Sequence, residues 1–240
     1  KVVKGSVVAT VTATGTLSAV TTVKVGSQVS GIIASLHADF NSEVKKGQLL
    51  AELDPTPFQA SVDQRRADVE KAKVELRNAD LVLARAKKLL DAQLQAQSEY
   101  DTAKANRDGA AASVEQSMAA LKQSETNLAY TKIVSPIDGV VVDRQYDVGQ
   151  TVAASFQAPV LFTIAQDLTK MQVLTNIDEA DIGKVKEGQE ASFSVDAFAD
   201  RPFHGSVSQI RLSPQTVQNV VTYPVLLDVA NPEGKLRPGM

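Results

Sequence analysis

Cysteine is absent from the 240 residues, which excludes disulfides, thiolate metal sites and thiol catalysis. Histidine occurs twice, at His37 and His204, and we expect surface or structural roles for both. The three methionines are scattered, so the sequence predicts no thioether cluster for Cu(I) or Ag(I). The sequence contains no recognisable pairing of a nucleophile with a base, no glycine-rich phosphate-binding loop and no spacing typical of metal ligands. The chain is therefore predicted to be no enzyme and to carry no cofactor.

Charge and hydropathy exclude two further classes of protein. The net charge of −3 argues against a nucleic-acid partner. No apolar run is long enough to cross a membrane. The sequence begins abruptly at Lys1 and stops at Met240 in the middle of a pattern, so we expect both ends to be cut.

Two short β-type half-motifs are the most informative feature that is present. The first runs from Gly31 to Asp54 and the second from Ser135 to Val152. Each reads as strand residues, a turn whose glycine can adopt a positive φ, and a second strand. The two half-motifs are predicted to be repeats that belong together, although a long segment separates them.

The separating segment has the apolar spacing of a coiled coil. Seam residues step alternately by four and three through two arms. In the first arm they are Phe58, Val62, Arg65, Val69, Ala72, Leu76, Ala79, Leu83, Ala86 and Leu90; in the second they are Tyr100, Ala103, Arg107, Ala110, Val114, Ser117, Leu121, Ser124 and Leu128. Pro55 and Pro57 fit a first helical turn, with Asp54 or Thr56 as N-cap. We predict an antiparallel helical hairpin that serves as a spacer or a docking element.

The paired halves resemble the two sides of a biotinyl/lipoyl carrier domain. In such a domain a hairpin between the halves carries the modified lysine, but here Pro55 stands in that place and a helix follows. One alternative is therefore a carrier relative whose lysine has been displaced, with Lys45, Lys46 or Lys132 as candidates. An intact-mass measurement would reveal a lipoyl or biotinyl adduct.

The rest of the chain predicts a small antiparallel barrel, because short strands with turn signals follow Met171. The predicted fold is mixed α and β, modular and elongated: a lipoyl-like β-sandwich split by a helical hairpin, followed by a β-barrel. The expected divisions are a strand of a truncated membrane-proximal domain over 1–14, a strand given to the barrel over 15–24, sandwich half A over 25–54, the hairpin over 55–128, sandwich half B over 129–166, and an incomplete barrel over 167–240.

This order of parts resembles the periplasmic adaptors, or membrane fusion proteins, of bacterial tripartite efflux pumps. The matching motifs are Val29 to Gly31, Val44 to Ala51, Leu128 to Gly139 and Leu236 to Met240. Within the family, Gln218 to Tyr223 and the loop from Ala154 to Pro159 look most like the MacA-type adaptors of ABC transporters. The hairpin length fits the adaptors of proton-driven resistance-nodulation-division pumps equally well, so these remain the alternative.

The resemblance implies a non-catalytic protein of the periplasm, anchored to the inner membrane through an N-terminal segment that precedes this sequence. It implies three kinds of contact. An inner-membrane transporter, favoured as ABC type, would lie at one end and a TolC-like outer-membrane channel at the hairpin tip. Copies of the chain would assemble into a ring, expected to be a hexamer in the pump.

Two sets of site residues follow from the resemblance. Adaptors that dock on TolC-like channels carry Arg, Leu four residues later and Ser seven after that; here the positions hold Arg85, Leu89 and Ala96, with Ser98 nearby. In MacA-type adaptors a sandwich loop places a ring of glutamines in the central channel. The equivalent position here is Phe156, with Gln157 beside it. We expect six phenylalanines to form an apolar gate, unless Phe156 packs into the core.

Overall fold

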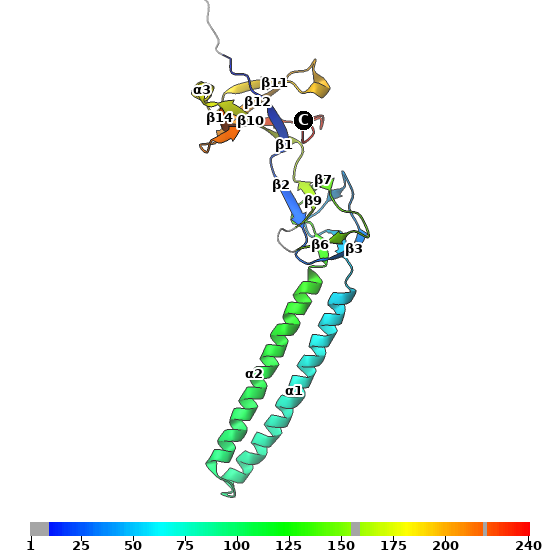
Figure 1. The fold of residues 1–240 in the computed structure, drawn as a ribbon, viewed down its shortest axis with the longest axis vertical. Coiled ribbons are helices and arrows are strands. Elements are labelled where there is room, and N and C mark those ends of the chain that lie inside the picture. Colours follow the sequence, from blue (N-terminus) through cyan, green and yellow to red (C-terminus); the bar gives the residue numbers. More distant parts are fainter. Residues whose placement is uncertain (1–9, 155–158, 218–219) are drawn as a thin grey trace, which may run out of the picture.

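The computed structural model describes residues 10–154, 159–217 and 220–240. Its parts follow one another along one long axis, with a β-barrel unit at one end, a β-sandwich in the middle and a helical hairpin at the other end (Figure 1). The structure therefore has the fold class predicted from the sequence, and the shape is elongated because, in the described residues, the two helices pack mainly on each other.

The hairpin consists of α1 (Thr56–Asp91) and α2 (Gln97–Ala129). Pro55 occupies the N-cap position of α1, and Pro57 lies in the first turn, where its missing N–H costs no helical hydrogen bond. Of the two predicted N-cap residues, Asp54 supplies the bond, since its Oδ1 accepts from the backbone N–H of Thr56 over 3.0 Å. The side-chain and backbone hydrogen bonds from Thr56 lower the pKa of Asp54.

The sandwich is one unit built from both half-motifs. Its strands are β2 (Thr22–Gly26), β3 (Gly31–Leu36), β4 (Glu43–Val44), β5 (Leu49–Leu53), β6 (Lys132–Val134), β7 (Gly139–Arg144), β8 (Thr151–Val152) and β9 (Val160–Ala165). One sheet has the order β2-β9-β7-β4 and the other the order β6-β5-β3-β8, so each sheet holds strands from before and after the hairpin. The largest fully buried side chains between them include Ile33, Leu50, Leu53, Leu161 and Phe162.

The position of the hairpin follows from one strand pair. β5 pairs with β6, Glu52 lies opposite Lys132, and the Leu53 N–H donates to the Thr131 carbonyl over 2.9 Å. The chain leaves the sandwich after β5 and returns at β6. The start of α1 and the end of α2 therefore lie side by side at one sheet, and the rod projects from the end of the sandwich (Figure 1).

Three turns share one construction with a glycine in the left-handed region. Gly47, Gly149 and Gly188 have φ of 81°, 85° and 80°, and each is followed by glutamine. In each turn the glutamine Oε1 accepts from the backbone N–H three residues earlier, as Gln48 does from Lys45 over 2.9 Å. The repeat read from the half-motifs therefore includes a side-chain hydrogen bond that fixes the turn.

Among the described residues, the barrel unit is a single antiparallel sheet of six strands. They are β1 (Gly15–Ala19), β10 (Lys170–Asp178), β11 (Glu190–Phe193), β12 (Phe203–Ile210), β13 (Gln215–Val217) and β14 (Val220–Ala230), with the short helices α3 (Glu179–Ile182) and η1 (Asp196–Phe198) between strands. The order is β1-β10-β14-β12-β11, and β13 also pairs with β14. Its core is separate from that of the sandwich and includes Met171, Val225, Leu227 and Leu236.

The N-terminal divisions need correction. We expected 15–24 to form one barrel strand, but β1 pairs with β10 in the barrel sheet while β2 pairs with β9 in the sandwich. Apolar alternation continues across the bend at Val20 and Thr21, with Leu17 buried in one core and Val25 in the other. Alternation predicts a strand but not its sheet. Of the expected strand 1–14, residues 1–9 lie outside the described residues and 10–14 form no strand.

Candidate docking site at the hairpin tip

The two helices pack on each other along a seam of small and medium side chains. The buried members are Val62, Val69, Ala72, Ala86, Ala103 and Ser124, all at predicted seam positions. Ser124 Oγ lies 3.3 Å from Ser61 Oγ across the interface. Small residues allow close approach of the helix backbones, and with only two helices most other seam residues remain half-buried.

Both seam arginines turn their charged groups away from the seam. Arg65 reaches Asp68 on its own helix over 3.4 Å. Arg107 donates from Nε to Asp80 of α1 over 2.9 Å and from Nη1 to Asp108 over 3.2 Å. The hydrogen bonds to Asp80 and then Asp108 raise the pKa of Arg107. A long cationic side chain can lay its apolar stem along a narrow seam and keep its charged group outside it, and both arginines do so.

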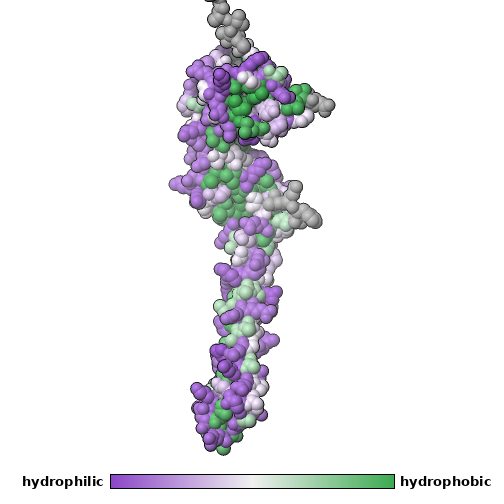
Figure 2. Space-filling model, turned by 90° about the vertical axis from the view of Figure 1, so that its left-hand side faces the viewer, coloured by the Kyte–Doolittle hydropathy of each residue, from purple (hydrophilic) through white to green (hydrophobic). Residues whose placement is uncertain are grey.

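The turn at the tip ends α1 with two hydrogen bonds that resemble a Schellman motif. The Gln93 N–H donates to the Leu90 carbonyl over 2.8 Å, and the Leu94 N–H donates to the Leu89 carbonyl over 2.9 Å. Gln93 has φ of 59°, a conformation for which glycine is the usual residue. The turn leaves Leu94 76% exposed and Leu89 44% exposed, so apolar surface appears at the end of a polar rod (Figure 2).

The second arm starts without a side-chain cap. Ala96 is the N-cap of α2, with extended backbone (ψ of 149°), and its methyl group cannot accept a hydrogen bond. This is the position at which the family motif has serine, which is a preferred N-cap residue. Glu99 stands at the third helical position, where a capping box would place it, but its Oε2 accepts from Gln95 instead, over 3.1 Å. Ser98 lies inside the first turn.

The predicted docking residues therefore lie on both sides of the tip. Arg85 and Leu89 are one turn apart on α1 and both exposed, whereas Ala96 opens α2. Within the described part of the chain, Arg85 has no ion-pair partner. Leu94 is a tip residue that the sequence reasoning did not select, because its exposure depends on the turn geometry. Phe156 and Gln157 lie outside the described residues.

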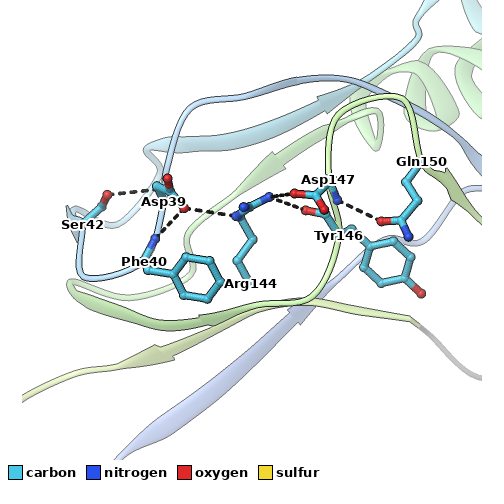
Figure 3. A network of polar contacts seen from close by, with 7 residues as sticks. All are labelled: Asp39, Phe40, Ser42, Arg144, Tyr146, Asp147 and Gln150. Atoms are coloured by element: carbon cyan, nitrogen blue, oxygen red, sulfur yellow. Dashed lines mark hydrogen bonds and ion pairs between the residues drawn. The ribbon is translucent and has the colours of Figure 1, made fainter.

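A polar network holds two loops of the sandwich together at the side chain of Arg144 (Figure 3). Arg144 Nε donates to Asp39 Oδ1 over 3.1 Å, while Nη1 donates to the Tyr146 carbonyl over 2.8 Å and to the carboxylate of Asp147. The guanidinium also lies 5.2 Å from the centre of the Phe40 ring. The hydrogen bond to Asp147 raises the pKa of Arg144. This network links the β3–β4 loop to the β7–β8 loop and thereby the two sheets.

Among the described residues, no three His, Asp or Glu side chains gather in a way that could hold a metal ion. His37 Nε2 lies 3.1 Å from Ser35 Oγ, and His204 stands on the exposed face of β12. In the same residues no helix is both long and apolar enough to cross a membrane.

Comparison with known proteins gives two family models that together cover most of the chain. One is described as the RND MFP, barrel-sandwich hybrid domain and matches residues 21–164; the other is the YknX-like beta-barrel domain and matches residues 171–240. The boundary between them falls between β9 and β10, where the structure passes from the sandwich to the barrel sheet.

Individual relatives agree with these models. Macrolide export protein MacA of Yersinia pestis is 36% identical over 99% of this chain and 67% of its own length. Multidrug resistance protein MdtA of Proteus mirabilis is 35% identical over 72% of this chain and 42% of its own length. The crystal structure of MacA from Actinobacillus actinomycetemcomitans has a TM-score of 0.82 at 35% identity, covering 96% of this chain and 75% of that chain.

The chain thus spans about two thirds of the length of the MacA relatives it matches. Their similarity extends over both β units and the hairpin, and it confirms the resemblance drawn from the sequence motifs. With a family model over more than half of the residues and relatives above 30% identity along nearly all of them, the chain belongs to the membrane fusion protein family.

Proposed function

We propose that this chain is the main part of a non-catalytic periplasmic adaptor, which links an inner-membrane transporter to a TolC-like outer-membrane channel in a tripartite efflux pump. The observation that carries the proposal is the helical rod. Its helices contribute no residue to the core of either β unit, and its tip exposes Arg85, Leu89 and Leu94. A rod with apolar and cationic groups at its end can reach and contact a distant partner. An anchor preceding this sequence would hold the adaptor on the inner membrane.

The favoured transporter is of the ABC type. The MacA relatives match nearly the whole chain, whereas the MdtA relative matches 72% of it. The proton-driven alternative is supported by the family model that matches the sandwich, because the description of that model names the resistance-nodulation-division (RND) class. Co-purification of the full-length adaptor with each class of permease distinguishes the two. A carrier function has no support from these matches.

The tip assignment is tested by reversing one charge. Arg85→Asp is expected to weaken binding to an immobilised TolC-like channel tenfold or more, while the far-UV circular dichroism and the melting temperature stay nearly unchanged, because an exposed residue contributes little to folding. Arg66→Asp is the matched control, since Arg66 is exposed on the same helix near the sandwich. If both variants bind the channel equally well, Arg85 at the hairpin tip is not part of the docking site.

A gate in the ring is the second part of the proposal. Six copies of Phe156 around the axis would form an apolar constriction that closes by expelling water. Phe156→Ala is expected to lower efflux in cells that carry the complete pump, with no change in the melting temperature of the purified chain. A loss of several kcal/mol, as truncation of a core aromatic produces, would instead make Phe156 a core residue.

A further inference from the structure

Two short connections join the barrel sheet to the sandwich. One consists of Val20 and Thr21 between β1 and β2, and the other of residues 166–169 between β9 and β10 (Figure 1). They lie side by side, because the Gln166 N–H donates to the Thr21 carbonyl over 3.0 Å. On either side of the junction the strands pair antiparallel, β1 with β10 and β2 with β9. One two-stranded ribbon therefore runs from the barrel unit into the sandwich.

The longer of the two connections is bent by its own side chains. Four residues link β9 to β10, whereas two link β1 to β2. In the longer link, which we call the connector (residues 166–169), Asp167 Oδ1 accepts from the Thr169 N–H over 2.8 Å and from Thr169 Oγ1 over 2.6 Å. The side-chain and then the backbone hydrogen bond from Thr169 lower the pKa of Asp167. The ionised carboxylate thus fixes the bend of the connector.

The barrel unit holds the connector through Asn231, which follows β14. The Asn231 backbone N–H donates to the Thr169 carbonyl over 2.7 Å, and its Nδ2 donates to the Leu168 carbonyl over 2.9 Å. The same side chain donates to the Leu236 carbonyl and accepts from the Leu236 N–H. Because Asn231 is 3% exposed, water cannot readily replace these partners. One buried residue therefore ties the connector to the loop over residues 231–240.

The same loop also holds the strand that leads into the shorter connection. The Gly239 N–H donates to the Leu17 carbonyl of β1 over 2.8 Å, and the Leu17 N–H donates to the Met240 carbonyl over 2.7 Å. Leu17 is buried in the barrel core, so β1 is fixed on this side by both backbone and side chain. The loop over residues 231–240 therefore contacts both chains of the ribbon close to the junction.

Apolar side chains of the sandwich and the connector continue the core of the barrel unit. Ala165 is fully buried at the end of sandwich strand β9, yet it belongs to the core cluster of the barrel unit. Val142 of β7 and Leu168 of the connector pack against the same cluster. A bend between the two units would separate these side chains and pull the connector carbonyls away from Asn231. Burial of the apolar surface and the hydrogen bonds therefore favour the same fixed arrangement.

We propose that Asp167 and Asn231 form a latch that makes the barrel unit and the sandwich move as one rigid body. Asp167 sets the shape of the connector, and Asn231 fastens the connector to the loop over residues 231–240. The inference concerns the chain by itself and holds whether or not the hairpin docks on a channel. In the adaptor proposed above, the latch would transmit a displacement of the barrel unit to the sandwich without loss in a flexible joint.

The distance between two spin labels tests the latch, and the absence of cysteine allows labelling at chosen positions. The labels are attached after His204→Cys in the barrel unit and Lys45→Cys in the sandwich, both exposed positions. Pulsed electron paramagnetic resonance is expected to give one narrow distance distribution. Asp167→Ala should broaden it about twofold, because the freed connector adopts several shapes. The control Asp228→Ala removes an exposed carboxylate that accepts from Gln172 on the same sheet, and should leave the width unchanged.

Asn231→Ala is the second variant and removes the side-chain bonds to Leu168 and Leu236. It should broaden the distribution as well, although the backbone bond to Thr169 remains. Asp167 is exposed and belongs to neither core cluster, so Asp167→Ala decides the question even if Asn231→Ala fails to fold. A broad distribution in the labelled chain without further substitutions overturns the proposal. An unchanged width in Asp167→Ala, or equal broadening by Asp228→Ala, also rejects the latch.

Discussion

Arg107 of α2 donates a hydrogen bond to Asp80 of α1 over 2.9 Å, although Arg107 stands at a seam position between the helices. The side chains are 39% and 50% exposed, so the ion pair lies at the rim of the interface. An exposed pair of this kind contributes at most about 1 kcal/mol. Its main consequence is register, because it joins two points at equal height on the antiparallel arms.

Leucine at the two seam arginines is expected to stabilise the hairpin by different amounts. Arg65→Leu extends the apolar seam and removes only an ion pair within one helix, whereas Arg107→Leu also removes the bond to Asp80. A half-buried leucine contributes about 1 kcal/mol, which the loss at Arg107 partly cancels. Melting followed by far-UV circular dichroism should rank Arg65→Leu above Arg107→Leu. The reverse order would mean that Arg65 has a structural partner along the seam.

The sequence predicts the hairpin well because its signal is local. A four-three repeat fixes which face of each helix is buried, and the buried residues Val62, Val69 and Ala103 all follow it. The tip was less predictable. Gln93 adopts the left-handed conformation without being glycine, and Ala96 is an N-cap without a side-chain acceptor. Both positions depart from the usual residue, so the sequence contains no positive signal for them.

Serine at position 96 is expected to stabilise α2 whether or not it changes docking. Its hydroxyl can accept from a free N–H of the first turn, and such a cap is worth about 1 kcal/mol. Ala92→Ser is the control, because Ala92 ends α1, where carbonyls and not N–H groups lack partners. Ala96→Ser should raise the melting temperature of the hairpin and strengthen channel binding or leave it unchanged. Weaker binding would show that this tip pairs with its channel in a different way.

In the β units, strands could be predicted from the sequence, but the sheet to which each strand belongs could not. Short strands with turn signals were expected after Met171, and β10, β12 and β14 lie in that part of the chain. Sheet membership is a long-range property, since residues far apart in sequence become neighbours. The division of residues 15–24 between two sheets could not be read from alternation. The hydrogen bonds from Arg144 to Asp39 and Asp147 could not be predicted from the sequence either.

Two glycine substitutions should change stability in opposite directions. A Cβ added at Gly139 on β7 would lie 2.2 Å from the Ala165 carbonyl oxygen of β9, so Gly139→Ala must push the strands apart. Overpacking of this kind costs about 1–3 kcal/mol. Gly109 in α2 has no atom within 4 Å of such a Cβ, and alanine there should stabilise the helix by about 0.5–1 kcal/mol. Amide hydrogen exchange in β7 and α2 separates the two effects.

The lowered pKa of Glu233 predicts how the stability of the barrel unit changes with pH. Hydrogen bonds from Lys235 and then Arg201 lower its pKa from 4.5 to about 2. A carboxylate with a depressed pKa in the folded state stabilises the fold above its unfolded pKa, and this contribution disappears as the pH falls from 4.5 to about 2. Glu233→Gln should therefore lower the melting temperature at neutral pH and have no effect near pH 2. A difference that is independent of pH would assign the effect to packing.

Asn231 is expected to be the most sensitive polar residue of the barrel unit. It is only 3% exposed, and its Nδ2 donates to the carbonyls of Leu168 and Leu236 over 2.9 Å each. Its Oδ1 accepts from the Leu236 N–H over 3.0 Å, which holds buried Leu236 against the core. Asn231→Ala leaves these backbone groups buried without partners, at a cost of about 1–3 kcal/mol for a buried unsatisfied group.

The matched control is Asn176→Ala, because Asn176 is exposed on β10 of the same sheet. Amide exchange in β10 and β14 reports the local stability of the barrel unit, whose core cluster is separate from that of the sandwich. Faster exchange throughout both strands is expected for Asn231→Ala, and little change for Asn176→Ala. If only the amides after Asn231 exchange faster, the asparagine orders the C-terminal loop and contributes nothing to the sheet, and the prediction is wrong.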